Sequence, residues 1–459
     1  MKYPAYPAYL QTNQEPIASL PSHWELRRLR FLAGRIEQGW SPQCDNLPAD
    51  DDAWGVMKVG CVNGNEFEAG ENKALPPELE PLAEFELRPG DVLVSRANTR
   101  ELVGSAALVP QNVRPRLLLC DKLFRLNALA ETQSQYLIYL LRTPAARFHY
   151  ERDATGASGS MQNIGQGTLK DVLVPIPPVE EQERIANFLD WKTSQIDGLI
   201  TKRQQHVDTL RERRMSVTFR LATAGLHAGV PLRDSGIPWA PRIPSHWRSG
   251  NIRRFATMKT GHTPARSDPA YWEDCDIPWF TLADVWQLRD GTRIYLGDTK
   301  EKISVLGLQN SAAEHLPRGT VIFSRTASVG FSGIMPIPMA TSQDFWNWTP
   351  DEGLLSEYLL VLFRAMEQEF KRLTMGSTHK TIYQPDAASL RICVPPPDEQ
   401  RDIVDKLFPF WRRMDGLIAK ATQSIEKLAE YRSALITAAI TGQIDVRGFQ
   451  FNGTEKNGS

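Results

Sequence analysis

Polar side chains suited to reading a nucleic acid follow short apolar runs at matching places in two parts of the chain. The run 92–95 (VLVS) leads into Arg96, and the run 321–324 (VIFS) leads into Arg325. Each run is typical of a buried strand that ends in a polar tip. Arginine matches the O6 and N7 edge of guanine, asparagine and glutamine match adenine, and lysine, serine and threonine more often hold phosphate. We therefore interpret the tips as candidate DNA contacts.

The same chemistry selects further loop residues in each half of the chain. The candidates in the first half are Lys58, Arg96, Asn98, Arg100, Lys122, Gln162 and Asn163. Those in the second half are Lys259, His262, Arg325, Thr326, Ser328, Gln343, His379 and Lys380. Any one of them taken alone can equally be a solvated loop residue. Arg96 and Arg325 are the stronger candidates, because each follows a strand at an equivalent place.

Sequence motifs of catalysis are missing. There is no G-x-x-x-x-G-K-[ST] phosphate loop and no H-E-x-x-H metal helix. The segment 156–160 (GASGS) resembles a nucleophile elbow but ends in serine where glycine is needed. The five cysteines lie far apart with no C-x-x-C pair, which is typical of free thiols in a reducing cytoplasm. We predict a chain with no catalytic residues, no metal site and no cofactor of its own.

Composition bounds these interpretations. A chain of 459 residues indicates two or three domains. No apolar run reaches the 18 residues of a membrane span, and residues 1–10 lack the apolar core of a signal peptide, so we expect a cytoplasmic protein. The net charge of −1 counts mildly against a nucleic-acid partner, so any basic surface must be local. We expect the tryptophans to lie mainly in the core.

An internal repeat is the strongest pattern in the sequence. LPSHW at 20–24 returns as IPSHW at 243–247, and each copy continues to a Tyr-Leu segment, 136–141 and 358–363. Each copy closes on a proline-rich helix start, PPVEEQ at 177–182 and PPPDEQ at 395–400. We interpret the two His-Trp pairs as packed corners. Outside this framework the copies diverge, as expected if each reads a different sequence.

A long helix is predicted after each proline-rich start. Its apolar residues recur in steps of three, four and seven, which is typical of a coiled-coil seam. The seam residues are Ile185, Leu189, Ile196, Ile200, Val207, Leu210 and Val217 in the first helix, and Ile403, Leu407, Met414, Ile418, Ile425, Leu428 and Leu435 in the second. A single such helix would favour packing on its own domain. Two matching helices of roughly 60 Å each are too long for that, so we expect them to pair.

The linker between the copies sets the direction of pairing. Parallel helices would stretch residues 222–242 along the whole length of a helix, whereas antiparallel helices need only a short turn. We therefore predict an α+β chain of two mixed α/β domains in tandem pseudo-repeat, separated by two long antiparallel coiled-coil helices. The expected divisions are 1–178 (core from about 20), helix 179–221, linker 222–242, 243–396, helix 397–442 and tail 443–459.

Basic residues gather on the first long helix. They are Lys202, Arg203, Arg211, Arg213, Arg214 and Arg220. This surface is open to three interpretations: a face toward DNA, a face toward acidic partner helices, or a solvated helix face.

The doubled pattern resembles the specificity subunit of type I restriction-modification systems from about residue 20 to 446. The resemblance rests on the P-S-H-W entry, the strand ending in Ser-Arg, the P-P-x-x-E-Q helix start and the closing segment 438–446 (AAITGQIDV). Residues 3–19 match only loosely, and the first helix ends in 221–225 (LATAG) rather than in the full closing pattern.

The resemblance implies a DNA-binding subunit that reads a split, asymmetric site with one target-recognition domain per half and uses the helix pair as a ruler. It implies two methyltransferase subunits, which bind S-adenosylmethionine, and two restriction/translocase subunits, which use ATP and Mg. The paired helices would also dock the methyltransferases, through apolar residues off the seam such as Phe188, Trp191, Phe408 and Phe410. This chain lacks the N-P-P-[YF] motif of adenine methyltransferases, in keeping with chemistry on its partners.

Two alternatives stay open at this point. The chain could be a coiled-coil scaffold whose two heads bind proteins, or a self-contained enzyme such as a fused methyltransferase. Salt-dependent DNA binding separates a DNA reader from a scaffold, and methyl transfer by the chain alone would identify the enzyme.

Overall fold

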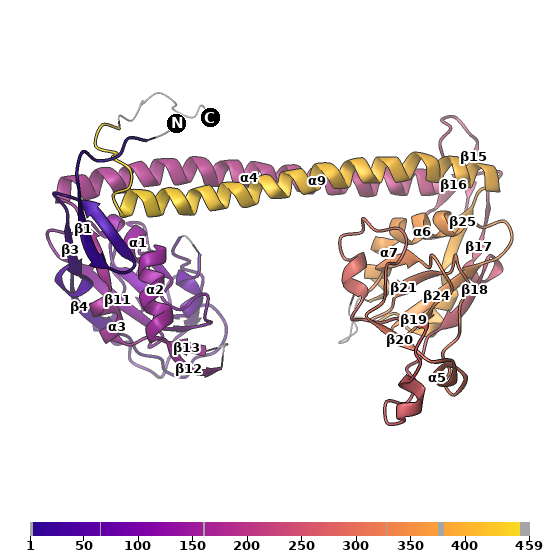
Figure 1. Ribbon diagram of the computed structural model, residues 1–459, viewed down its shortest axis with the longest axis horizontal. Helices are drawn as coiled ribbons and strands as arrows, with labels where there is room; N and C mark the ends of the chain where they lie inside the picture. The colour runs from indigo at the N-terminus through magenta and orange to yellow at the C-terminus, as the bar shows by residue number, and fades with distance from the viewer. Residues whose placement is uncertain (1–2, 65, 159–160, 327, 375–380, 450–459) are drawn as a thin grey trace. The chain divides into compact units, whose positions relative to one another are not determined.

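The computed structural model describes residues 3–64, 66–158, 161–326, 328–374 and 381–449 (Figure 1). By its internal contacts the chain forms two compact units. The first comprises Met1–Thr201 and Ile425–Ser459, and the second comprises Lys202–Ser424. Each of the two long helices therefore contributes one part to each unit. No helix in the described ranges has a stretch long and apolar enough to cross a membrane.

The first unit is built on a four-stranded antiparallel sheet, in the order β4-β11-β7-β9, and a three-stranded sheet, in the order β10-β5-β6. Their bounds are β4 Ala33–Gln38, β5 Gly55–Met57, β6 Asn72–Ala74, β7 Val92–Ser95, β9 Ala106–Leu108, β10 Leu117–Leu118 and β11 Leu123–Ala128. Smaller sheets pair β1 Tyr9–Gln14 with β2 Ile17–Pro21, pair β3 Glu25–Arg28 with β14 Leu173–Ile176, and join β12 Thr155–Ser158, β13 Met161–Asn163 and β8 Ala97–Asn98.

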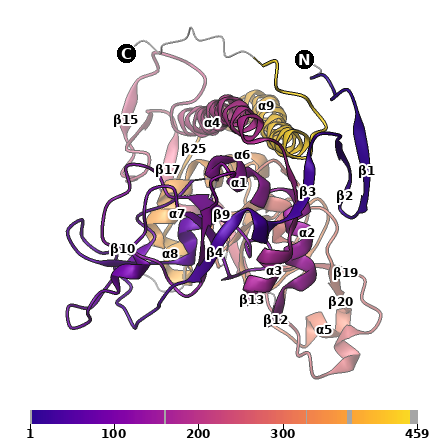
Figure 2. The same cartoon turned by 90° about the vertical axis from the view of Figure 1, so that its left-hand side faces the viewer.

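Short helices complete the first unit: α1 Ser134–Leu141, α2 Pro144–Asp153 and α3 Gln166–Asp171, with 3-10 turns at Leu29–Phe31, Val59–Val62 and Ala83–Phe85. The side chains of α1 share one core with those of the long helices, and Figure 2 shows α1 beneath them.

The second unit repeats this plan. Its four-stranded sheet has the order β18-β24-β21-β22, and its three-stranded sheet has the order β20-β19-β23. The strand bounds are β15 Leu232–Asp234, β16 Arg242–Pro244, β17 Arg248–Asn251, β18 Ala256–Thr260, β19 Ile277–Phe280, β20 Glu301–Ile303, β21 Val321–Ser324, β22 Ser332–Ile334, β23 Ala340–Thr341, β24 Phe345–Pro350 and β25 Arg391–Val394. Its helices are α5 Val305–Gln309, α6 Ser356–Ala365, α7 Glu367–Leu373 and α8 Gln384–Ser389, with 3-10 turns at Ile252–Arg254, Pro269–Trp272 and Val285–Leu288.

Matching backbone turns show that the repeat holds in detail. Gly90 (φ +89°) precedes β7, and Gly319 (φ +87°) precedes β21. Glycine is favoured at both positions because side chains strain this left-handed conformation. The strands that carry Arg96 and Arg325 therefore leave equivalent turns and enter equivalent sheets.

The long helices are α4 Val179–Ala224 and α9 Pro397–Ile440. In the first unit, Ile185 and Leu189 near the start of α4 share a core with Leu435 and Ala439 near the end of α9. In the second unit, the end of α4 shares a core with the start of α9. The start of one helix therefore packs on the end of the other, which confirms the predicted antiparallel pairing. Gly225 (φ +69°) and Gly442 (φ +71°) follow the two helix ends in the left-handed conformation common there.

The predicted seam residues are all buried or half-buried. The buried ones are Ile185, Leu189, Ile196, Val207, Leu210, Ile403, Leu407, Met414 and Leu435. The half-buried ones are Ile200, Val217, Ile418, Ile425 and Leu428. Phe188 lies off the seam and was expected to dock a methyltransferase, but it is fully buried. Its ring packs against those of Tyr3 and Phe449, with centroids 5.2 and 4.9 Å away. It is therefore part of the first core, and no partner subunit can reach its ring.

The glutamine of each P-P-x-x-E-Q segment forms hydrogen bonds that anchor the start of the long helix. Gln182 accepts a hydrogen bond from the amide of Gln133 (3.1 Å) and donates to the carbonyl of Pro177 (3.0 Å). Gln400 accepts from the amide of Leu355 and donates to the carbonyl of Pro395, both at 2.8 Å. These buried amides tie the start of each long helix to the segment that leads into α1 or α6.

The glutamate before each of these glutamines binds the histidine of the His-Trp pair. His23 lies 2.9 Å from Glu181, and His246 lies 2.9 Å from Glu399. Trp24 and Trp247 are buried beside them. Each tryptophan is therefore a packed corner, whereas its histidine is exposed and joins the domain to the long helix through the glutamate.

Candidate nucleic-acid interface

Arg96 and Arg325 are held by the same backbone frame. The amide of Arg96 donates to the carbonyl of Lys122 (2.8 Å), and its carbonyl accepts from the amide of Ile164 (2.9 Å). The amide of Arg325 donates to the carbonyl of Asp344, and its carbonyl accepts from Ile382, both at 2.9 Å. Because both the backbone amide and the backbone carbonyl of each arginine are hydrogen-bonded, its side chain starts from a fixed position, as a base contact requires.

In the first unit the strand pairing brings most candidates together. β8 pairs with β13, which places Asn98 opposite Gln162 and Ala97 opposite Asn163. The amide nitrogen of Asn98 donates to Asn63 Oδ1 (2.8 Å), and its own Oδ1 accepts from the amide of Thr99 (2.9 Å). Asn63 thereby joins the group, although sequence reasoning did not select it.

The remaining candidates of the first unit surround this group. Lys122 is exposed and lies beside Arg96 through the backbone bond to its carbonyl. Arg100 is exposed two residues beyond Asn98. Lys58 is half-buried at the start of the turn Val59–Val62, whose far end leads to Asn63. Arginine, lysine and amide residues are thus neighbours in this part of the unit, a mixture suited to both bases and phosphates.

The Arg325 tip of the second unit is packed more closely. The guanidinium of Arg325 lies 4.8 Å from the centre of the Trp346 ring, and its Nε is buried without a partner in the described part of the chain. Thr326 accepts a hydrogen bond from Ser324 Oγ through its carbonyl (2.8 Å). Ser328 is half-buried on the same loop and lines a cavity described below.

The other candidates of the second unit form a second, looser group. His262 is exposed, and the neighbouring Thr263 donates to Gln343 Oε1 (2.7 Å). Lys259 lies on β18 and is engaged in an ion pair with Glu314 (2.9 Å). A paired lysine offers less positive potential to a phosphate than a free one. His379 and Lys380 lie outside the described residues.

The exposure of one tryptophan and the orientation of one arginine differ from what the sequence predicts. Trp286 is 61% exposed on the turn Val285–Leu288, so the expectation that the tryptophans lie in the core is wrong for this one. Arg214 belongs to the basic run of α4, but its guanidinium turns inward to Asp415 of α9, with 3.0 Å between Nε and Oδ1. The other five basic residues of that run are exposed.

The cysteines are unpaired and three of them are buried. Burial raises the pKa of Cys120 to about 11 and that of Cys393 to about 12, which keeps both as unreactive thiols. Within the described ranges no group of three or more histidine, cysteine, aspartate or glutamate side chains could hold a metal ion.

Comparison with known proteins gives a consistent result. Residues 78–208 and 244–427 match the family model described as the type I restriction modification DNA specificity domain. The chain is 22% identical over 440 residues to a putative type I restriction enzyme MjaX specificity subunit of Methanocaldococcus jannaschii, covering 94% of this chain and 96% of that one. It is 30% identical over 181 residues to the EcoEI specificity subunit of Escherichia coli, which covers 39% of this chain and 30% of that relative.

The fold also has a solved counterpart. A chain from a structure titled for complex assembly and conformational transition of the type I R-M system superposes with a TM-score of 0.68. The match covers 93% of this chain and 99% of that one at 18% sequence identity, so it supports the fold.

Proposed function

The chain belongs to the type I restriction modification DNA specificity family, and from this we propose that it reads a two-part, asymmetric DNA site with one half assigned to each unit. Specificity subunits of these systems are non-catalytic, and their partners are DNA and the other restriction-modification subunits. The proposal concerns how this chain divides the reading of its site.

A single observation carries the proposal: the framework is the same in both units and the tips differ. Arg96 and Arg325 occupy the same frame of backbone hydrogen bonds. Around Arg96 stand the amide side chains of Asn98 and Asn163, whereas the loop of Arg325 carries the hydroxyls of Thr326 and Ser328. Equivalent positions with different hydrogen-bonding groups favour two half-sites of different sequence.

The partner subunits are part of the same proposal. Exposed apolar side chains interrupt the polar surface of the long helices in both units: Leu199 and Tyr431 in the first, and Met215, Phe219 and Leu417 in the second. Exposed apolar side chains of this kind are available to pack against a partner. We assign one methyltransferase subunit to each unit, with two restriction/translocase subunits in the complete complex. S-adenosylmethionine, ATP and Mg would then be bound by those partners.

The decisive experiment is sequencing of methylated bases in a host that carries this chain with its methyltransferase subunit. We expect one split motif with a fixed gap. Exchange of residues 20–178 for those of another specificity subunit should alter one half of the motif and leave the other half and the gap unchanged. An uninterrupted motif, or changes in both halves, would refute the proposal.

A gel-shift titration tests the competing function of a protein-binding scaffold. A DNA reader loses affinity steeply as salt rises and prefers its motif over random duplex. A scaffold would show neither behaviour.

A further inference from the structure

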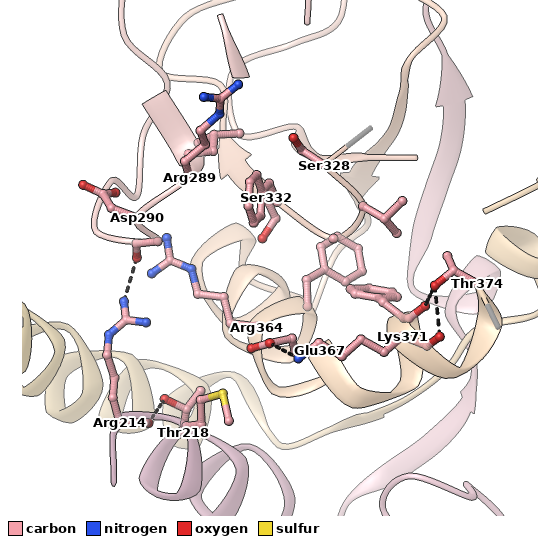
Figure 3. A pocket seen from close by; sticks show the side chains of 18 residues that line it. Arg214, Thr218, Arg289, Asp290, Ser328, Ser332, Arg364, Glu367, Lys371 and Thr374 are labelled. Atoms are coloured by element: carbon pink, nitrogen blue, oxygen red, sulfur yellow. Dashed lines mark hydrogen bonds and ion pairs between the residues drawn. The ribbon is translucent and has the colours of Figure 1, made fainter. Parts of the chain in front are cut away.

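A cavity of about 490 Å³ lies in the second unit and is lined by residues of α4, α6 and α7 (Figure 3). One wall is aromatic, made by Phe331, Phe363 and Phe370. Cationic side chains surround it: Arg214, Arg289, Arg364 and Lys371. Its volume falls in the range of sites that hold a small molecule or a group of side chains.

Arg364 is the unusual member of this lining. Its guanidinium stacks on Trp411 (4.5 Å to the ring centre), and Nη2 donates to the carbonyl of Arg293 (2.6 Å). Nη1 is buried and has no hydrogen-bond partner among the described residues. Burial, followed by the nearby charge of Arg214, lowers the pKa of Arg364 to about 9. Arginine stays charged in proteins, so the shift reflects a cation held where water solvates it poorly.

The acidic side chains around the cavity are already engaged. Asp415 pairs with Arg214 (3.0 Å), and Glu367 pairs with Lys371 (2.7 Å). Asp290 accepts from the amide of Thr292 (2.9 Å) within its own loop. Native proteins rarely leave a buried charged donor without an acceptor. Asp415 and Asp290 lie near enough to raise the pKa of Arg364, but neither accepts a hydrogen bond from its Nη1. The cavity therefore holds a buried cationic donor whose acceptor is not among the described residues.

The first unit has a smaller cavity with an arginine at the equivalent place. Arg142 follows the Tyr-Leu helix α1 as Arg364 follows the corresponding segment of α6, and Arg432 of α9 pairs with Asp197 of α4 (2.9 Å). Arg142 and Arg432 line a smaller cavity of about 270 Å³. Here Nε and Nη2 of Arg142 both donate to the carbonyl of Ala106. An arginine-lined cavity beside the long helices is kept in both units, while the tips differ, which favours a partner that both units share.

We propose that the cavity beside Arg364 receives an acidic side chain, with a neighbouring apolar one, from a methyltransferase subunit. This rests on the proposed function, in which that subunit binds the long helices. Met215 connects the cavity with the exposed apolar side chains of α4. It lines the cavity and is also 39% exposed, one turn before the exposed Phe219. The acid pairs with Nη1 of Arg364, and the apolar side chain packs on the aromatic wall.

DNA fits this cavity less well. A duplex presents its phosphates on a broad convex surface, and they are usually met by exposed cations. Arg364 Nη1 is instead enclosed beside an aromatic wall, which a narrow protein side chain can enter.

The test measures how many methyltransferase subunits the full chain binds, using native mass spectrometry and titration with the purified subunit. Wild-type chain is expected to bind two. Arg364→Met is expected to weaken one of the two binding events by about 30-fold or more, because the partner acid loses its buried counter-charge. Arg289→Glu, at the exposed rim, should weaken the same event by repulsion. Arg318→Glu, on an exposed arginine of the same unit outside the lining, is the matched control and should change neither event.

The outcomes separate the ideas. If Arg364→Met fails to fold, as judged by its thermal transition, Arg289→Glu and Met215→Asp carry the test. Folded variants that bind two methyltransferases with wild-type affinity would overturn the inference and leave the proposed function standing. Loss of DNA affinity with unchanged methyltransferase binding would also overturn it and assign the cavity to a phosphate. Failure of the wild-type chain to bind any methyltransferase would refute the proposed function itself.

Discussion

Arg214 of α4 and Asp415 of α9 form an ion pair, with 3.0 Å between Nε and Oδ1, and each side chain is at most 17% exposed. The repeat supplies a counterpart with the helices exchanged, in which Arg432 of α9 pairs with Asp197 of α4 at 2.9 Å. The counterpart is more open, because Asp197 is 44% exposed. The two pairs fix the same register of the helices, one within each unit.

This difference in exposure predicts different effects of the same substitution. Asp415→Asn removes the ion-pair partner of Arg214 in a poorly solvated place, and should lower the free energy of unfolding by about 2–3 kcal/mol. Asp197→Asn should lower it by less than about 1 kcal/mol. The Asp197 carboxylate is exposed, so water screens its attraction to Arg432 and the pair contributes little. Urea unfolding of the two variants beside wild type measures both values. Equal losses would show that exposure does not govern these pairs.

The buried glutamines at the helix starts give a second prediction. Gln400→Leu keeps the approximate volume but removes the bonds to the amide of Leu355 and the carbonyls of Pro395 and Gly353. Buried backbone groups that lose their partners cost about 1–3 kcal/mol each, so we expect a loss of at least about 2 kcal/mol in urea unfolding. Gln205→Leu, on an exposed face of α4, is the control and should stay within about 0.5 kcal/mol of wild type. A small effect at Gln400 would mean that its bonds are replaced by water.

The framework could be predicted from the sequence because each part of it follows from a local pattern. Apolar steps of three and four place Ile185 and Leu435 on a seam, and the short linker 222–242 permits antiparallel closure. The P-P-x-x-E-Q segments mark where the helices begin, although the partners of Gln182 and Gln400 depend on chain folding and could not be read from the motif.

The rest depends on contacts between residues that are distant in the chain. Arg214 stood in a basic run and was grouped with exposed residues, because its partner Asp415 is placed by the register of two helices. Asn63 was missed because it lies 35 residues from Asn98 in the sequence, and only folding brings the end of the turn Val59–Val62 beside Asn98. Phe188 was expected to face a partner subunit, yet Phe449 of the C-terminal segment covers it. No spacing in the sequence reveals these three contacts.

His149 predicts a dependence of stability on pH. Burial, followed by the charge of Arg152, lowers the pKa of His149 below the value of about 6.5 for a free imidazole. Below that pH the unfolded chain gains a proton that the folded chain resists, so stability is complete above about pH 6.5 and is lost as pH falls toward the folded pKa. The loss at pH 5.5 is at most about 1.4 kcal/mol.

Urea midpoints at pH 7.5 and pH 5.5 measure this dependence. His149→Gln cannot titrate, so the fall in midpoint between the two pH values should be smaller for the variant than for wild type. An equal fall in both proteins would place the pH dependence on other groups.

The two arginine tips predict separate defects in DNA reading. If Arg96 contacts a base of the first half-site, Arg96→Ala should cost about 1–3 kcal/mol and relax the preference at one position of that half. Arg325→Ala should do the same in the other half, because its tip has the equivalent frame in the second unit. Lys122→Ala, beside Arg96, should instead weaken binding to all sequences alike and reduce the salt slope by about one, as expected for a phosphate contact. Gel shifts against a panel of single-base variants, repeated over a range of salt concentrations, distinguish these patterns. If Arg96→Ala instead lowered the affinity for all single-base variants of both half-sites equally, Arg96 would contact the DNA backbone. The choice of bases would then fall to the amide side chains of Asn98 and Asn163.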